Sequence, residues 1–357
     1  MPGSVFFEPG PLADAGGDAA RAFFSSRRVF FCFCRFHGRG RPWQPGAVAD
    51  SPWSVLTLPA TPLLAETPEA FFRDVGVRIA AGSPETLAVL GGFSADRLGF
   101  GFVCGYVAAL RRLTKSHAGI TALAATEAGG AHPRAIETTL SQQGDQVVLN
   151  GTKAFVTLGS LCAEVYVLAH VGQDAAGRKR LRLVRMPTSS SGAHMHALPA
   201  TPFAPEIPHC RLTLTDVRLP TDSVLPGDGW ADYVRPFRTI EDTFVMLAAL
   251  GYMLGVVRRG AASEALLDAV VAALTSALYV AELPPSEART HVLLGAALGQ
   301  VQGVMRALGA AFPAGLPDEG ARFHRDAPLL SVAEKARSAR KRKAFLELGL
   351  AAAPGSD

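Results

Sequence analysis

The segment from Ile120 to Gly159 constrains the fold of this chain more than any other part of the sequence. It opens with small and apolar residues suited to a strand, passes the turn-rich Gly129-Gly130, and ends in the alternation typical of paired strands. Asn150-Gly151 predicts a hairpin turn between those strands, because both residues tolerate positive φ. Periodicity alone therefore favours a β-barrel hairpin without a ligand.

Helical periodicity lies on both sides of this β-rich centre. Before it, from Pro68 to His117, apolar residues recur at helical spacing, with Phe71, Val75 and Ile79 on one face. After Gly227 the chain returns to helices, which are predicted over residues 239–259, 263–283, 286–312 and about 330–350.

This order of elements predicts an α+β protein of three domains. Residues 1–118 form a pared-down N-terminal helical domain whose first sixty residues carry no clear pattern. Residues 119–227 form a central antiparallel β-barrel domain, which ends in the alternating strand from Cys210 to Pro220. Residues 228–357 form a shortened C-terminal helical bundle.

Composition excludes several classes of protein. With 48% hydrophobic and 18% charged residues in 357, the chain is globular rather than disordered. A net charge of +4, evenly spread, gives no reason to expect nucleic acid. The start of the chain lacks a signal-peptide pattern, and the longest apolar run, Phe244 to Val257, is shorter than a membrane span. We therefore expect a cytoplasmic protein without a membrane span.

The cysteines and histidines indicate no metal site. Five cysteines form no C-x-x-C pair, which argues against a disulfide framework and a zinc site and favours reduced core thiols. Cys32 and Cys34 fit a buried segment, and His194 and His196 fit the exposed face of a strand. No metal is predicted.

Read in linear order, the block from Ile120 to Gly159 resembles the flavin-binding β-domain signature of the acyl-CoA dehydrogenases along its whole length. The Asp-Val-x-x-Pro exit at Asp216 to Pro220 is similar to the end of that domain. The resemblance implies the family's three-domain fold and FAD as the cofactor. It also implies which residues lie along the edge and over the face of the flavin ring, namely Leu123, Ala125, Thr126, Phe155 and Thr157.

The sequence departs from the family at three places. Where the family reads T-E-P-G-x-G-S-D, His132 and Pro133 take the Ser-Asp positions beside the substrate thioester. The Arg-x-x-Phe-Gly loop that holds a neighbour's flavin diphosphate is missing. The Gly-Gly-x-Gly at the adenine end reads Leu308-Gly309-Ala310-Ala311, so the distal half of the usual FAD site is eroded.

Dehydrogenation of an acyl thioester requires a base for the α-proton, and a desolvated glutamate suits that role. The resemblance offers two candidates. Glu241 matches the site used by isovaleryl- and long-chain-type enzymes, and Glu334 matches the commoner site between the last helices. We favour Glu241, because an apolar run follows it, whereas Lys335 and Arg337 near Glu334 would lower its pKa. Each glutamate could equally be an ordinary helix-surface acid.

The resemblance also places Asp242 near the pantetheine or nucleotide of CoA, at a position that is usually Arg. An acid there disfavours ordinary CoA binding. The basic run from Arg337 to Lys343 offers a surface to an acidic acyl carrier protein, although such a run is also typical of a solvated helix end. Either carrier is therefore an expected partner.

The leading hypothesis is an FAD-dependent acyl-thioester dehydrogenase that forms a trans-2-enoyl product. Its other partners would be an electron-transfer acceptor or oxygen, and the family implies a homodimer or homotetramer. One rival is a catalytically silent partner subunit, suggested by the eroded adenine site and by Lys335-Ala336. Another is a flavin monooxygenase on the same fold, against which the two candidate bases argue.

Overall fold

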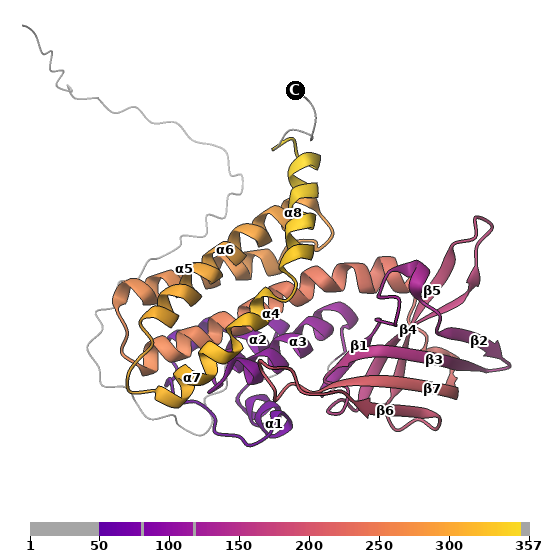
Figure 1. The fold of residues 1–357 in the computed structure, drawn as a ribbon, viewed down its shortest axis with the longest axis horizontal. Helices are drawn as coiled ribbons and strands as arrows, with labels where there is room; N and C mark the ends of the chain where they lie inside the picture. Colours follow the sequence, from indigo (N-terminus) through magenta and orange to yellow (C-terminus); the bar gives the residue numbers. More distant parts are fainter. Residues whose placement is uncertain (1–49, 80–81, 117–118, 351–357) are drawn as a thin grey trace, which may run out of the picture. The chain divides into compact units, whose positions relative to one another are not determined.

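The computed structural model describes residues 50–79, 82–116 and 119–350. The expectations for Cys32 and Cys34 therefore lie outside the described residues. Figure 1 shows helices on one side and a curled sheet on the other, with the helix α4 running between them.

Three helices precede the sheet within the stretch from Pro68 to His117 that was predicted to be helical. After a short 3-10 turn, η1 (Pro52–Leu56), come α1 (Pro68–Arg78), α2 (Pro84–Phe93) and α3 (Leu98–Thr114). Thr67 and Ser83 cap α1 and α2 by accepting backbone N–H groups, and a proline follows each cap. Phe71 and Val75 of α1 are fully buried, as their helical spacing predicts.

Seven strands form one mixed sheet that curls into a half-barrel. Their order is β1-β4-β2-β3-β7-β6, and β5 pairs with β4 outside this path. Most neighbours are antiparallel, whereas β1 pairs with β4 in parallel. The strands are β1 (Thr121–Ala124), β2 (Thr139–Gln143), β3 (Gln146–Thr157), β4 (Glu164–Gln173), β5 (Lys179–Pro187), β6 (Ala193–Ala197) and β7 (His209–Pro220).

The hairpin turn lies earlier in the chain than Asn150-Gly151. Both residues lie within β3, where Gly151 has φ 149° and sits at a bulge opposite β7. The turn between β2 and β3 is made by Gly144, whose φ is 63°. The prediction was wrong because a glycine with positive φ serves a strand bulge as well as a turn. His194 and His196 are exposed on β6, as predicted.

The C-terminal helices follow the predicted order with one addition. A π-helical turn, η4 (Gly229–Val234), leads into α4 (Arg235–Arg259), and α5 (Glu264–Ala281) and α6 (Ala288–Ala310) follow. A helix absent from the prediction, α7 (Pro317–Asp326), comes next. Its end passes into the 3-10 turn η5 (Ala327–Ser331) and α8 (Glu334–Glu347). The α7 helix was not predicted because it is short and mostly polar, so it has few apolar residues from which helical periodicity can be recognised.

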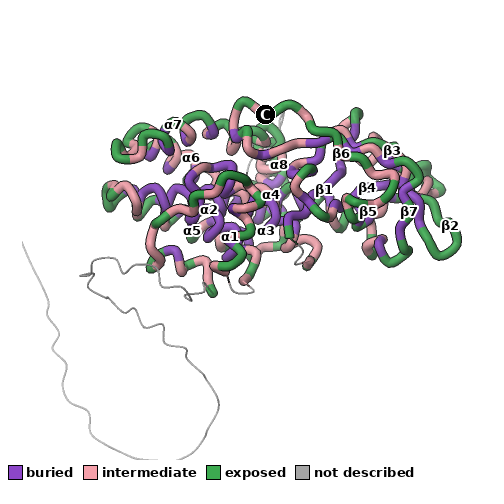
Figure 2. The backbone as a smooth tube through the Cα atoms, turned by 90° about the horizontal axis from the view of Figure 1, so that it is seen from below, coloured by how far each residue is buried: buried purple, intermediate pink, exposed green. Residues whose placement is uncertain are grey.

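The core lies where α2, α3 and α4 cross, and Figure 2 shows it as the most continuous buried part of the helical layer. Glycines permit this close packing. A Cβ on Gly92 would lie 1.8 Å from the carbonyl oxygen of Ala248 on α4, and one on Gly251 would lie 2.1 Å from that of Val89. The α4 helix is thereby fixed against α2 along the stretch that follows Glu241.

Three helical segments are long and apolar enough, by length and composition only, to cross a membrane: Gly229–Arg259, Glu264–Ala281 and Ala288–Ala310. Uninterrupted apolar runs did not reveal these segments, and the absence of a membrane span stays a prediction. The first segment is 78% buried inside the protein, whereas the other two are 39% and 28% buried. The helices α5 and α6 are therefore less buried than α4, although Tyr279 is the only large hydrophobic side chain exposed on them among the described residues.

Candidate active site

A cavity of about 480 Å³ lies between the sheet and the helices. Its walls come from α3, from β1 and the end of β3, from the start of β7, and from α4, α6 and the η5–α8 segment. All five residues expected beside a flavin line it: Leu123, Ala125, Thr126, Phe155 and Thr157. The structure thus brings together residues that are up to 34 positions apart in sequence.

The sheet holds the aromatic and hydroxyl groups of this wall in register. Thr126 and Phe155 form an isolated β-bridge, and Thr157 pairs with His209 across β3 and β7. Phe155, 43% exposed, stacks on the His209 ring with centroids 4.4 Å apart. Nδ1 of His209 is shielded from solvent and has no partner among the described residues. Burial lowers the pKa of His209, which favours the neutral ring.

Behind the wall, a buried ion pair fixes the residue next to Thr126. Nζ of Lys153 donates to Oε1 of Glu127 at 2.6 Å, and neither side chain is more than 6% exposed. Burial raises the pKa of Glu127, but Lys153 and hydrogen bonds from Thr138 and Glu137 outweigh it and hold the pKa below its usual value. Burial lowers the pKa of Lys153 to about 8. This network anchors β3 to the turn after Thr126.

Glu241 lies on α4 and lines the cavity opposite this wall. It forms no ion pair among the described residues. Burial raises the pKa of Glu241 to about 7, and the neighbouring Asp242 adds to the rise, whereas Arg238, Arg340 and Arg337 oppose it. A carboxylate with such a pKa accepts a proton near neutral pH and keeps more basicity than an exposed one.

Asp242 is held by two cations from the last helix. Nη1 of Arg337 lies 3.1 Å from its Oδ1, and Arg340 pairs with its Oδ2. Burial raises the pKa of Asp242, and the two guanidinium groups oppose that rise. Asp242 and Arg337 both line the cavity, so this cluster forms part of its rim.

The other two predicted residues lie outside the cavity lining. Glu334 is exposed at the start of α8 and lines two outer grooves, whereas its neighbour Ala333 lines the cavity itself. His132 is exposed, accepts the N–H of Arg134 through Nδ1, and lies 6.4 Å from the Trp230 ring.

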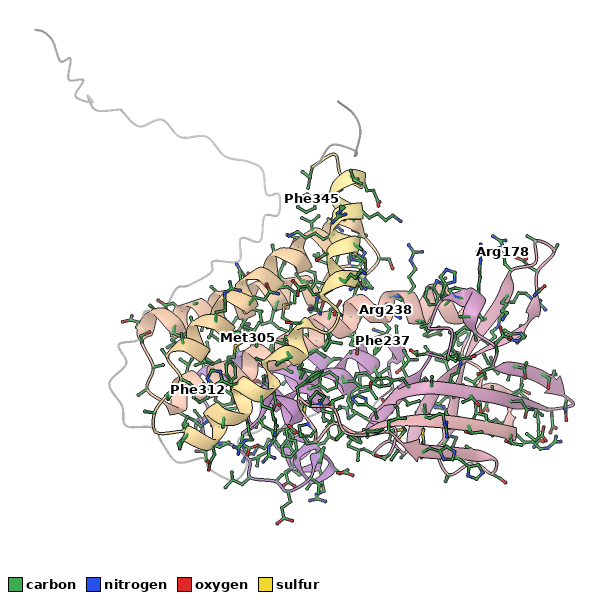
Figure 3. The ribbon with its side chains drawn as sticks, in the orientation of Figure 1. Arg178, Phe237, Arg238, Met305, Phe312 and Phe345 are labelled. Atoms are coloured by element: carbon green, nitrogen blue, oxygen red, sulfur yellow. The ribbon has the colours of Figure 1, made fainter. Side chains whose placement is uncertain are left out.

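Several cavity residues were not predicted from the sequence. Tyr106 on α3 is 3% exposed, and its hydroxyl accepts the N–H of Leu123 at 3.2 Å. Phe237 meets the Tyr106 ring edge-on at 5.8 Å, and Figure 3 shows Phe237 beside Arg238 on α4. On a helix, Tyr106 has the pattern of a core residue, so no sequence signal distinguishes it. His209 had a sequence signal in its place at the start of the alternating strand, and in the sheet it pairs with Thr157.

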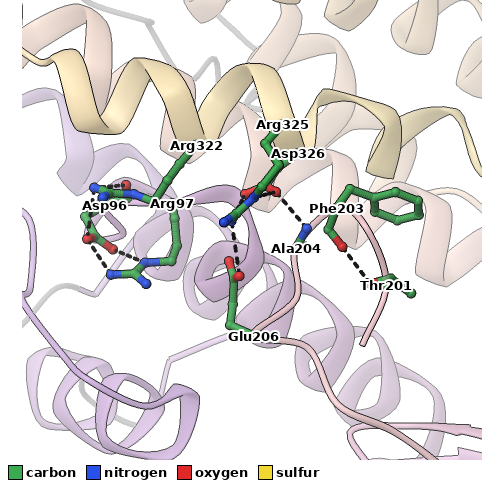
Figure 4. Close-up of polar contacts among 9 residues, drawn as sticks. All are labelled: Asp96, Arg97, Thr201, Phe203, Ala204, Glu206, Arg322, Arg325 and Asp326. Carbon is green, nitrogen blue, oxygen red and sulfur yellow. Dashed lines mark hydrogen bonds and ion pairs between the residues drawn. The ribbon is translucent and has the colours of Figure 1, made fainter. Parts of the chain in front are cut away.

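Hydrogen bonds and ion pairs from α7 hold the loop of residues 201–206, which forms another side of the cavity (Figure 4). Thr201 and Phe203 of this loop line the cavity, and the Thr201 hydroxyl donates to the Phe203 carbonyl at 2.6 Å. The fully buried Asp326 at the end of α7 accepts the N–H of Ala204 at 2.6 Å. Arg325 pairs with both Asp326 and Glu206 of the loop. The α7 helix therefore determines where the Phe203 ring lies.

Known proteins share this fold. Residues 122–217 match the family model of the acyl-CoA dehydrogenase middle domain. The middle domain and the fold around it are those of the acyl-CoA dehydrogenases, so the family resemblance and the predicted fold class are confirmed. No curated protein sequence matches the chain significantly.

Solved structures of this fold have different chemistries. Butyryl-CoA dehydrogenase from Megasphaera elsdenii is 15% identical with a TM-score of 0.57, over 74% of this chain and 80% of that one. FMN-bound TdsC from Paenibacillus sp. A11-2 is 16% identical with a TM-score of 0.58, over 77% and 86%. The prolyl acyl carrier protein oxidase AnaB is 17% identical with a TM-score of 0.55, over 76% and 85%.

Proposed function

We propose that this protein is a flavin-dependent dehydrogenase of acyl thioesters in which Glu241 is the base. The observation that carries the proposal is that Glu241, with a pKa raised to about 7, lines the same cavity as Thr126, Phe155 and Thr157. A carboxylate thus lies in one chamber with the wall that the family resemblance assigns to a flavin ring.

Within this cavity Glu241 would remove the α-proton of the acyl group and hold it on its carboxylate. Apolar neighbours such as Val245, Met246 and Leu298 exclude water, and this strengthens the base. As the α-carbon loses its proton, negative charge develops on the thioester oxygen and requires a hydrogen-bond donor. The resemblance offers the backbone N–H of Glu334 for this role, next to the cavity-lining Ala333.

The described residues fit a flavin ring. The hydroxyls of Thr126 and Thr157 line the cavity beside the exposed face of Phe155, which supports contacts to the polar edge and face of a ring. A flavin bound there would supply the acceptor for the hydride that leaves the β-carbon. We propose FAD. The stretch that the resemblance assigns to the adenine end is helical rather than an open turn, because Gly309 lies inside α6 against Phe323 and His324. FMN is therefore the alternative to be measured.

The proposal also covers the carrier of the acyl group, the electron acceptor, the oligomeric state and the location of the protein. The thioester carrier is CoA or an acyl carrier protein, and relatives of both kinds share the fold. The electrons would pass to an electron-transfer protein or to oxygen. The family resemblance implies a homodimer or homotetramer, which we propose together with a cytoplasmic location.

The test begins with the visible spectrum of the purified protein and chromatography of the released cofactor. Anaerobic mixing with a panel of short acyl thioesters should bleach the flavin band. Glu241→Gln should keep the flavin but lose about 10²–10⁴ in the reduction rate, as expected when a general base is removed. Glu334→Gln is the matched control and should keep most of that rate.

Each alternative outcome has a distinct meaning. A colourless protein that takes up neither FAD nor FMN would overturn the flavin assignment and leave the silent partner subunit. Loss of activity in Glu334→Gln alone would reverse the assignment of the base. If neither substitution slowed reduction, neither glutamate would be the base. If no thioester reduced the flavin, the dehydrogenase would be excluded in favour of the monooxygenase, which does not need this base.

A further inference from the structure

A second, smaller cavity of about 160 Å³ lies where the starts of α4 and α6 meet α8. Three cations line it. Arg235 begins α4, and Arg340 and Lys343 lie on α8 one helical turn apart. The only acid in its lining is Glu347. Side chains from two helices thus direct an excess of positive charge into one hollow, and helical pairs at this spacing repel each other unless an anion lies between them.

Polar groups in this hollow have few protein partners, and Arg235 and Lys343 are exposed to solvent. Among the described residues, neither Arg235 nor Lys343 forms an ion pair, and Arg340 pairs only with Asp242. Nδ1 of His291, on the first turn of α6, is shielded from solvent without a partner. No side chain caps that turn, so its backbone N–H groups add positive potential. Burial lowers the pKa of His291, and Arg340, Arg235 and Lys343 add to the effect.

The hollow and the cavity beside Glu241 are linked by shared lining residues next to Asp242. Arg340 and His291 also line a groove of about 250 Å³ between α6 and α8. Arg337 lines both this groove and the catalytic cavity. A chain of shared residues therefore leads from the position of Glu241 past two arginines to the hollow at Lys343.

We propose that the hollow formed by Arg235, His291, Arg340 and Lys343 is a phosphate site, which holds the phosphate ester of the pantetheine arm that delivers the acyl thioester. This inference rests on the proposed function for the identity of the arm. The charge, donor count and size of the site identify a phosphate group independently of that function, since clustered cations and backbone N–H groups bind phosphate oxygens strongly. The arm would pass along the groove and leave its thioester end beside Glu241.

Calorimetry on the full-length protein tests the site without any turnover. 4′-Phosphopantetheine should bind about tenfold or more tightly than pantetheine, because two or more charge-assisted hydrogen bonds are added. The double variant Arg235→Gln/Lys343→Gln should remove that advantage and leave pantetheine binding unchanged. Arg342→Gln is the control, since Arg342 is an exposed cation on the same helix that lines none of these cavities. Equal affinities for the two ligands, or an equal loss in the control, would overturn the proposal.

A second measurement separates this inference from the proposed function and identifies the source of the arm. An acyl thioester of N-acetylcysteamine has no phosphate, so it should reduce the flavin equally in wild type and double variant. Acyl-CoA and the same acyl group on a carrier protein should each lose affinity in the double variant if they use the site. A loss with one of them alone identifies that carrier. If neither loses affinity, the hollow does not bind the phosphate of the pantetheine arm. If no thioester reduces the flavin, that result contradicts only the proposed dehydrogenase activity.

Discussion

Arg337 of α8 donates to Asp242 of α4, with Nη1 3.1 Å from Oδ1, and so ties the last helix to the helix that carries Glu241. Arg340 makes a second link to the same carboxylate. The two adjacent acids on α4 therefore differ in their ion pairing. Asp242 is paired with two cations, whereas Glu241 lines the cavity and forms no ion pair among the described residues. Because Asp242 raises the pKa of Glu241 and the arginines lower it, their balance sets the pH range in which the base works.

The rate of flavin reduction should rise with pH, with a midpoint near 7, because only ionised Glu241 accepts a proton. Asp242→Asn should move the midpoint to lower pH, because it removes a negative charge and leaves two guanidinium groups near Glu241. Anaerobic stopped-flow measurements between pH 5 and 9 check both. Asp268→Asn on the exposed face of α5 is the charge-matched control. A flat profile would mean that Glu241 does not titrate in this step.

The stability of the fold should depend on the same carboxyl group. Its pKa is raised in the folded state, so its contribution to the free energy of unfolding is fully present below its unfolded pKa and is lost as pH rises through about 7. Glu241→Gln removes this dependence and should therefore raise the melting temperature relative to wild type more at pH 8 than at pH 5. Melting curves of the two proteins at both pH values test this. An equal difference at the two values would refute it.

Lys153→Met should destabilise the fold by about 3–5 kcal/mol, because it leaves the buried Glu127 carboxylate without its cation. The double variant Glu127→Gln/Lys153→Met should recover much of that loss, since neither charge then remains buried. Urea denaturation gives both values. If the double variant is as unstable as the single one, packing around Lys153 rather than the uncompensated charge causes the loss.

Two glycine-to-alanine substitutions should have opposite effects on stability. A Cβ on Gly92 would overlap the Ala248 carbonyl oxygen at 1.8 Å, so Gly92→Ala should cost about 3 kcal/mol or more by forcing α2 from α4. Gly303 lies within α6 with no atom within 4 Å of such a Cβ, and Gly303→Ala should stabilise by about 0.5–1 kcal/mol. Thermal unfolding curves of the two variants and of the wild type measure both changes in stability. A stable Gly92→Ala protein would contradict the close helix crossing.

Asp326→Ala should weaken substrate binding while the flavin stays bound. The substitution frees the Ala204 N–H and loosens the loop that places Phe203 in the cavity wall. We expect a loss of about five- to thirtyfold in thioester affinity, as for one charged hydrogen bond of 1–2 kcal/mol. Asp326→Asn keeps an acceptor oxygen and should restore most of the affinity. Titration of the flavin spectrum with a non-reducible thioester analogue measures both variants.

The clustering of Thr126, Phe155 and Thr157 on one cavity wall was predictable because these residues belong to one short block of sequence. The chain between Thr126 and Phe155 folds back on itself, so that the two residues form a β-bridge. The alternation of apolar residues in this block indicates such strand pairing. The hairpin turn was placed wrongly within this same block, since Gly144 and Gly151 both adopt positive φ and only the strand register distinguishes the turn from the bulge.

The sequence by itself determined the succession of a helical region, a β domain and a second helical region, and the presence of Glu241 ahead of an apolar run. These features depend on local periodicity and on a linear motif. Only the tertiary structure decided that Glu241 rather than Glu334 lines the cavity, that Tyr106 and Phe203 close it, and that Asp242 is neutralised by the last helix. Those relationships join segments up to about two hundred residues apart, and their geometry depends on how α3, α4, α7 and α8 pack against the sheet, which no local pattern encodes.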